Sequence, residues 1–325
     1  MQAVVRETKR RSGWSTRRTL GALGIPASSY YRWLREAAWK SARQEPFRPV
    51  QAYEALEEEK QAVRDYACRH TELRHRELAW RMVDEDVAYV SPSTVYRILR
   101  EANLVCPWRR RKKRRREALE QAQRPDERWG TDLMYLRVGT GQYYLVTFLD
   151  EYSRYLVHWE LLSSMDGMSV SLAAQAALET LERTEEGKLK TPPEIRSDNG
   201  SCYISRDFHC VLEAHGLGHQ RIKPHCPEEN GLVERSNRTL REALEETELT
   251  SRQQAEEVLG KIITWYNTER LHSALGYLRP VDYYRGRPEE LREARRHKLS
   301  AARHRRRERN LKLKQPTLAL EKITP

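Results

Sequence analysis

The spacing of hydrophobic positions along the chain changes from helical to strand-like near residue 126. Before that point, apolar residues recur three or four positions apart, as in amphipathic helices. Between residues 128 and 162, three runs rich in Tyr, Val, Leu and Thr follow one another, a pattern typical of β-strands. Helical stripes and short strand-like runs then alternate. This order predicts all-α segments followed by an α/β domain with a mixed sheet.

Residues 1–45 are predicted to form a helical segment interrupted by a turn. The break falls at Gly24–Pro26, and Ser28 or Ser29 can cap the helix that follows. Two short helices around such a turn resemble a helix-turn-helix, although an ordinary helical hairpin has the same pattern.

Residues 50–106 repeat this theme and are predicted to form a helix-turn-helix DNA-binding domain. Ser91 is a natural N-cap, and Pro92 suits the first position of a helix. The apolar stripe of this helix consists of Val95, Ile98 and Leu99. Its other faces are left open to phosphates or base edges. The candidate DNA contacts on those faces are Thr94, Arg97 and Arg100.

Charge points to a polyanionic partner. The chain carries 59 Lys and Arg against 47 Asp and Glu, a net charge of +12, and such an excess favours nucleic acid through the release of counterions. A basic protein of ribosomal type has a similar balance. We predict a basic linker at 107–125 and a basic tail at 286–325, the tail either helical or disordered. The linker includes eight consecutive cations, all candidate DNA contacts: Arg109, Arg110, Arg111, Lys112, Lys113, Arg114, Arg115 and Arg116.

Other patterns limit the class of protein. No apolar run approaches the roughly 20 residues of a membrane helix, and the N-terminus lacks a signal peptide, so we expect a cytoplasmic, nucleoid-associated prokaryotic protein. Five scattered cysteines argue against a disulfide framework. Cys68, His70 and His75 lie close together, but a structural zinc site needs a fourth ligand at similar spacing. Zinc is therefore not expected.

Three carboxylates stand in distinctive contexts. Asp132 lies in a predicted strand within W-x-T-D, Asp198 ends another strand within S-D-N-G, and Glu234 lies on a predicted helix within N-G-x-x-E-R. Phosphoryl transfer on DNA uses two divalent ions about 4 Å apart, and Mg²⁺ prefers oxygen ligands. Among 47 acids a single one means little, but the combination predicts a catalytic and metal-binding set.

With these motifs in view, the chain resembles the OrfB-type insertion-sequence transposases, whose integrase catalytic core is related to retroviral integrases. GIPASSYYRWL and VSPSTVYRILREANL resemble the N-terminal segments of that family. The motif after the second strand is matched by Asp150, Ser153 and Arg154. The closing pattern is matched by Tyr266, Asn267, Arg270, His272, Leu275, Gly276, Tyr277 and Pro280.

The resemblance implies an RNase H-like core over 126–285, a mixed five-stranded sheet with flanking helices. It implies a DDE mechanism in which Asp132, Asp198 and Glu234 hold two Mg²⁺ ions, with Mn²⁺ able to substitute. The reaction would be strand cleavage at the ends of an element, followed by transfer of the 3′-hydroxyl into target DNA. Further candidate DNA contacts are Arg241, Arg238 and Asn230. Arg241 lies about two helical turns after Glu234 and so shares its face of the helix. Asn230, one turn before Glu234, could instead orient that acid.

Four other residues near these motifs have predicted supporting roles. Asn199 is expected to support the metal ligands without binding the metal itself. Asp150 is expected to be structural, and His272, like His225, to contact substrate or pack rather than to act as a base.

The expected partners are double-stranded DNA with the terminal repeats of the element, target DNA, further copies of the chain in a dimer or larger assembly, and an upstream-frame (OrfA-type) protein or fusion. A decayed transposase acting as a sequence-specific repressor is the main alternative. A nuclease of the same fold and a chromatin protein are two others, but the predicted helix-turn-helix domains favour recognition of DNA ends, and a chromatin protein would not explain the strand-borne acids.

Overall fold

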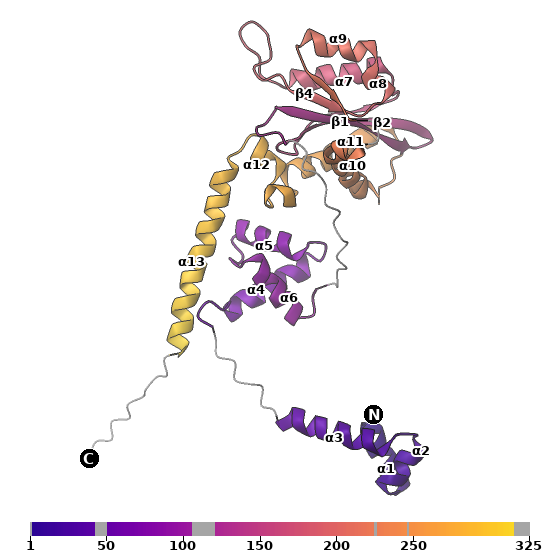
Figure 1. Cartoon of the computed structure of the whole chain (residues 1–325), viewed down its shortest axis with the longest axis vertical. Helices are drawn as coiled ribbons and strands as arrows, with labels where there is room; N and C mark the ends of the chain where they lie inside the picture. Colours follow the sequence, from indigo (N-terminus) through magenta and orange to yellow (C-terminus); the bar gives the residue numbers. More distant parts are fainter. Residues whose placement is uncertain (1, 43–50, 106–120, 224–225, 246, 315–325) are drawn as a thin grey trace, which may run out of the picture. The chain divides into compact units, whose positions relative to one another are not determined.

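A computed structural model describes residues 2–42, 51–105, 121–223, 226–245 and 247–314 of the chain (Figure 1). The chain divides into two compact units. One comprises residues 1–54 and 303–325, and the other comprises residues 55–302. The second unit contains all three candidate acids.

The N-terminal segment is helical, as predicted. A small apolar cluster of Val5, Leu20 and Tyr30 holds its helices together. Ser15 caps the second of them by accepting a hydrogen bond from the Arg18 amide. The three helices are α1 (Gln2–Ser12), α2 (Thr16–Ala22) and α3 (Ala27–Ala42).

The prediction that Ser28 or Ser29 caps α3 is wrong. The helix begins at Ala27, because the carbonyl of Pro26 already accepts a helical hydrogen bond from the Tyr30 amide at 3.2 Å. Both serines therefore lie inside the first turn of the helix.

Residues 55–105 form a three-helix domain with its own apolar core. Ser91 accepts the amide of Thr94 at 3.3 Å, and Pro92 is the first residue of the last helix, as the sequence predicts. The stripe of Val95, Ile98 and Leu99 is buried in the core of this domain, also as predicted. The helices are α4 (Glu57–Arg69), α5 (His75–Asp84) and α6 (Pro92–Glu101).

A mixed five-stranded sheet forms the centre of the second unit, in the order β3-β2-β1-β4-β5. The first three strands pair antiparallel, whereas β4 pairs parallel to β1 and β5 parallel to β4. The strands are β1 (Arg128–Val138), β2 (Gly141–Asp150), β3 (Leu156–Leu162), β4 (Glu194–Ser197) and β5 (His219–Arg221).

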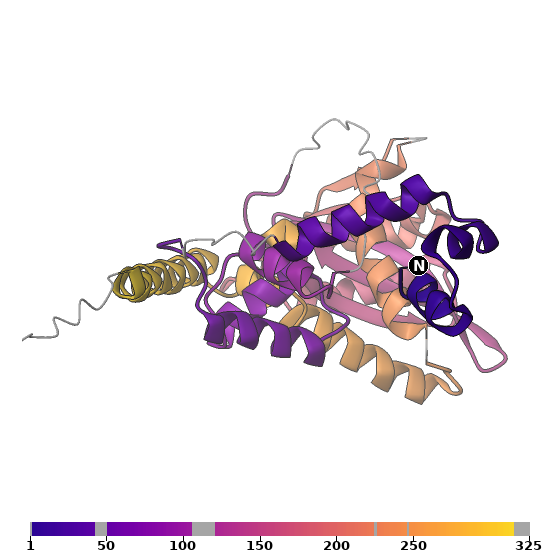
Figure 2. The same ribbon diagram turned by 90° about the horizontal axis from the view of Figure 1, so that it is seen from below.

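Helices cover both faces of this sheet, which gives the RNase H-like arrangement that was predicted. One face packs against α7 (Gly167–Glu179), α8 (Ser201–Ile204) and α9 (Arg206–Ala214). The other packs against α10 (Gly231–Leu244) and α11 (Arg252–Thr268). Figure 1 shows these two layers, and Figure 2 looks onto the orange helices with the strands behind them. The shorter helices are the 3₁₀ helices η1 (Pro227–Asn230) and η2 (Ser273–Leu275) and the α-helix α12 (Pro280–Tyr284).

The basic tail is helical rather than irregular over its described part. Helix α13 (Pro288–Lys314) contains most of the cations of this tail. Among the described helices, none is long and apolar enough to span a membrane.

Candidate active site

Asp132 lies in the middle of the sheet. It belongs to β1, the central strand, whose side chains alternate between the two faces. Trp129 packs in the core on the α7 side and Met134 in the core on the α10 side. The alternation therefore directs Asp132 toward α10, and a hydrogen bond from that helix to its carboxylate confirms this orientation.

Asp198 follows β4 in register with Asp132. The parallel pairing matches Arg128 with Glu194 and Gly130 with Arg196. Two residues further along both strands, the same offset brings Asp198 beside Asp132. Its Oδ1 accepts the Gly200 amide at 2.9 Å, which fixes the orientation of the carboxylate after the strand ends.

Glu234 reaches this region from the first turn of α10 and is exposed. The helix can approach β1 closely because Gly130 has no side chain. A Cβ at Gly130 would lie 2.3 Å from Cγ2 of Val233, the residue before Glu234. Gly130 thus sets how near the third acid comes to the other two.

Asn237 connects α10 to Asp132 and was missed in the sequence analysis. It is only 5% exposed. Its Nδ2 donates to Asp132 Oδ2 at 3.0 Å, and its Oδ1 accepts from the Thr147 hydroxyl at 3.2 Å. The position three residues after Glu234 shares a helical face with it, and this spacing is the signal that could have identified Asn237.

The three acids interact electrostatically. The pKa of Asp132 is raised to about 6. Burial is the main cause, and Asp198 and Glu234 add to the rise, whereas hydrogen bonds from the Leu133 backbone and Asn237 oppose it. Such mutual repulsion is what a bound cation relieves, and the donors are all carboxylate oxygens, which suits a hard divalent ion. Within the described residues, however, no three such side chains are arranged to hold a metal ion.

The candidate DNA contacts on α10 differ in accessibility. Arg241 and Arg238 are exposed, and Arg238 pairs with Glu242 at 2.9 Å. Asn230 is only 3% exposed, and its Oδ1 has no hydrogen-bond partner within the part of the chain that the structure describes. The burial of Asn230 favours a role in the position of α10 rather than direct contact with DNA.

The candidates on α6 lie outside its buried stripe. Arg97 and Arg100 are exposed, and Arg97 donates to the Thr94 hydroxyl at 3.2 Å. The basic run from Arg109 to Arg116 and His225 lie outside the described residues.

The other residues that the sequence analysis singled out have structural contacts. Asp150 is fully buried and accepts the amides of Asp126 and Ser153 at the turn after β2. Asn199 donates to the Ile222 carbonyl at 3.0 Å, which ties down the segment after Asp198. Burial and neighbouring arginines lower the pKa of His272 to about 3, so its ring is neutral.

The closing pattern also has a mechanical basis. Asn267 accepts the Leu156 amide at 2.9 Å and donates to the Leu156 carbonyl at 3.0 Å, which joins the end of α11 to β3. Gly276 has a φ of +66°, a left-handed conformation that favours glycine. Pro280 begins α12. The hydrogen bonds of Asn267 hold the end of α11 against the sheet.

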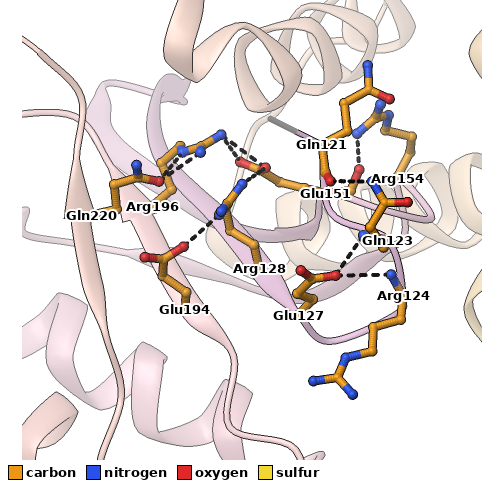
Figure 3. Close-up of polar contacts among 10 residues, drawn as sticks. All are labelled: Gln121, Gln123, Arg124, Glu127, Arg128, Glu151, Arg154, Glu194, Arg196 and Gln220. Atoms are coloured by element: carbon orange, nitrogen blue, oxygen red, sulfur yellow. Dashed lines mark hydrogen bonds and ion pairs between the residues drawn. The ribbon is translucent and has the colours of Figure 1, made fainter. Parts of the chain in front are cut away.

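A buried ion network, also missed in the sequence analysis, links β1, β4 and β5 to the turn after β2 (Figure 3). Arg196 donates to Glu151 at 3.0 Å and to Gln220 at 2.7 Å, and Arg128 donates to Glu194 at 2.7 Å. Glu151 is 4% exposed. Arg196 lies two residues before Asp198, so the network fixes the strand that delivers this acid.

Two family models match the region just described. Residues 122–227 match one integrase core domain model and residues 215–280 match a second. The matched segments together contain all three acids. They also contain the paired strands β1 and β4, which position Asp132 and Asp198.

Curated relatives are transposable-element proteins. The chain is 29% identical over 161 residues to the transposase for insertion sequence element IS904 of Lactococcus lactis, covering 49% of this chain and 61% of that protein. It is 28% identical over 249 residues to an uncharacterized 31.7 kDa protein of insertion element IS407 from Burkholderia multivorans, covering 73% and 86%. The chain thus spans about three fifths of the length of the IS904 transposase.

A solved structure also aligns with the chain. It is the HTLV-2 integrase catalytic core domain in complex with magnesium, 17% identical, with a TM-score of 0.40, covering 50% of this chain and 99% of that one.

Proposed function

We propose that this chain is a DNA transposase that acts by a DDE mechanism. Its relatives include insertion-sequence transposases, and its residues 122–280 match integrase core domain models. The reaction would cut a strand at the end of an element and join the freed 3′-hydroxyl to target DNA. The observation that carries the proposal is the placement of the three acids: Asp132 lies on β1, Asp198 directly follows the paired strand β4, and Glu234 lies in the first turn of the helix that donates a hydrogen bond to Asp132.

The same three acids would hold the divalent ions, two Mg²⁺ per site, with Mn²⁺ able to substitute. When bound, these ions supply activation of the attacking oxygen and neutralisation of charge on the leaving oxygen. The donor set supports this assignment because it consists of carboxylate oxygens that repel one another.

The residues around the acids would orient them. Asn237 holds one oxygen of Asp132, and the Gly200 amide holds one oxygen of Asp198. These bonds limit rotation of both carboxylates, so less conformational entropy is lost when substrate binds. Arg241, exposed two turns after Glu234 on α10, would contact the phosphate backbone near the reacting bond.

Recognition of the element end would fall to the 55–105 domain. Helix α6 exposes Arg97 and Arg100 beside its buried stripe, an arrangement suited to phosphate or base contacts. The partners in this proposal are double-stranded DNA bearing terminal repeats, target DNA, and further copies of the chain that bring two ends together. An upstream-frame protein, separate or fused, would complete the assembly.

Strand transfer in vitro tests the proposal. Full-length protein is mixed with Mg²⁺, a labelled duplex carrying the element end and target DNA. The variant Asp198→Asn is run beside Asp207→Asn, a matched change of an exposed acid on α9. We expect joined product from the wild type and from Asp207→Asn, and none from Asp198→Asn.

The alternative outcomes separate the rival functions. Binding of the duplex without cutting or joining, in Mg²⁺ and in Mn²⁺, would contradict the enzyme and favour a DNA-binding repressor. The same assay with the upstream-frame protein fused determines whether a missing partner accounts for that result. Equal activity of Asp198→Asn and wild type would refute the assignment of the acids.

A further inference from the structure

Arg295, in the first half of α13, connects the 55–105 domain with the closing turn of the core at Gly276 and Tyr277. The 55–105 domain lies outside the segments that match integrase core models. Its guanidinium binds Asp84 at the end of α5 through two hydrogen bonds, Nε to Oδ1 at 2.8 Å and Nη2 to Oδ2 at 2.6 Å. It also donates to the carbonyls of Gly276 at 3.2 Å and Tyr277 at 2.7 Å. The arginine is only 5% exposed.

The two carbonyls belong to the closing turn of the core. Gly276 and Tyr277 both have positive φ values, +66° and +61°. Arg295 supplies donors to both of their carbonyls and lies over the Trp80 ring of α5 at 4.9 Å. Its planar fork, rather than its charge alone, satisfies this set of acceptors.

A second cation on α13 repeats the contact. Lys298, one turn after Arg295, donates to the Val83 carbonyl at 3.0 Å and to the carboxylate of Asp86. It also lies 6.0 Å from the Tyr89 ring centroid. The helix therefore engages the end of α5 and the segment after it through two successive turns.

Open space lies beside the polar contacts of this joint. A cavity of about 510 Å³ lies beside Arg295 and Asp84 and also borders Leu271, Leu278 and Leu291. Domains that meet through a small or incompletely packed interface move relative to each other unless specific contacts prevent it. Arg295 and Lys298 provide such contacts here.

We propose that Arg295 is a positioning residue, which fixes the 55–105 domain against the closing turn of the core and so sets which phosphate of a bound DNA end reaches Asp132. The cutting step rests on the proposed function, whereas the clamp itself does not. Asp84 is its counterpart on α5, and the pair spans segments 211 positions apart in sequence.

The test compares Arg295→Met, which keeps the aliphatic stem, with Asp84→Asn, Arg295→Lys and a control. The control is Arg296→Met, since Arg296 is exposed and has no polar partner among the described residues. Cleavage positions are mapped at nucleotide resolution on the labelled element end, beside a gel-shift titration of the same duplex. All measurements use the full chain.

We expect Arg295→Met and Asp84→Asn to bind the duplex within about twofold of wild type. Cuts at the wild-type phosphate should fall about tenfold relative to cuts at neighbouring phosphates, because small displacements of a reacting group cost large factors in rate. Arg295→Lys should lie between them and wild type, and Arg296→Met should match wild type. A lower rate with the same cut position in both variants would overturn the positioning role, since a purely structural defect does not redistribute cuts.

A second measurement keeps the clamp testable if the wild type proves inactive. Hydrogen exchange of the free protein is followed at the amides of residues 83–89 and 276–278. We expect faster exchange at both segments in Arg295→Met and Asp84→Asn but not in Arg296→Met. Unchanged exchange at both segments would overturn the clamp. Altered exchange in a chain that never cuts DNA would instead count against the proposed function alone.

Discussion

Asn237 and Asp132 are joined by a hydrogen bond of 3.0 Å between the side-chain amide on α10 and the carboxylate on β1. Glu234 lies one turn earlier on the same helix. A shift of α10 therefore moves one acid of the site and reorients another. Two of the three carboxylates depend on the placement of a single helix.

This relationship predicts that Asn237→Ala weakens metal-dependent activity without abolishing the fold. Loss of a residue that orients a metal ligand typically costs about 10- to 100-fold in affinity or rate. The Mg²⁺ concentration that gives half-maximal strand transfer should therefore rise. Thr147→Val, which removes only the hydroxyl that bonds Asn237, should give a smaller shift in the same direction. An unchanged Mg²⁺ dependence in Asn237→Ala would show that the hydrogen bond has no such role.

Gly130 offers a separate test of how α10 is positioned. A Cβ at this site would meet Cγ2 of Val233 at 2.3 Å, so Gly130→Ala should destabilise the fold by about 1–3 kcal/mol through overpacking. Urea unfolding measures the change. Combining it with Val233→Ala removes the clashing methyl group, so the double variant should lose less stability than the sum of the two single changes. Strict additivity would argue against this close approach.

Local patterns predicted the elements of the fold better than they predicted the site. The run from Arg128 to Val138 is a strand over the whole of its predicted length, and Ser91 caps its helix, because alternation and capping act between near neighbours. The cap expected at Ser28 or Ser29 failed because that helix begins earlier, at Ala27, where the Pro26 carbonyl already accepts a helical hydrogen bond.

The contacts that organise the site join residues far apart in sequence. Glu151 and Arg196 are 45 positions apart, and Asn237 and Asp132 are 105 positions apart. No spacing rule along the chain pairs them, since the first contact depends on strand order and the second on how α10 packs against β1. The three acids themselves were recognised from motifs, whereas their proximity could be seen only from the arrangement of the strands in the sheet.

The buried pair of Glu151 and Arg196 should contribute to stability in a way that a surface pair does not. Arg196→Met removes the closest cation of the buried carboxylate and leaves Arg128, whose Nη1 lies 3.8 Å away, and the more weakly coupled Arg154. We expect a loss of about 3 kcal/mol in the free energy of unfolding. Lys190→Met breaks the exposed pair with Glu182 and should cost about 0.5 kcal/mol or less.

The double variant Arg196→Met with Glu151→Met sharpens this comparison. Replacing both charges removes the unpaired carboxylate, so the double variant should be more stable than Arg196→Met alone. Chemical unfolding of the four proteins under one buffer measures these differences. If Arg196→Met proved as mild as Lys190→Met, the buried pair would not behave as the geometry implies.

Asp150 should make stability depend on pH in a direction opposite to that of a salt-bridged acid. Burial raises its pKa to about 6, although Ser153 and the Asp126 amide donate to it. The folded state then keeps a proton that the unfolded state loses between about pH 4 and pH 6. The contribution of Asp150 to stability is therefore present at low pH and is lost as pH rises through 6. Compared with Asp150→Asn, which does not titrate, the wild type should gain roughly 1–3 kcal/mol in relative stability between pH 7 and pH 4. Unfolding of both proteins in a metal-free buffer series measures this difference, in which the contributions of Asp132 and Glu151 cancel. A difference that stays constant, or that favours the variant at low pH, would mean that burial does not raise the pKa of this carboxyl.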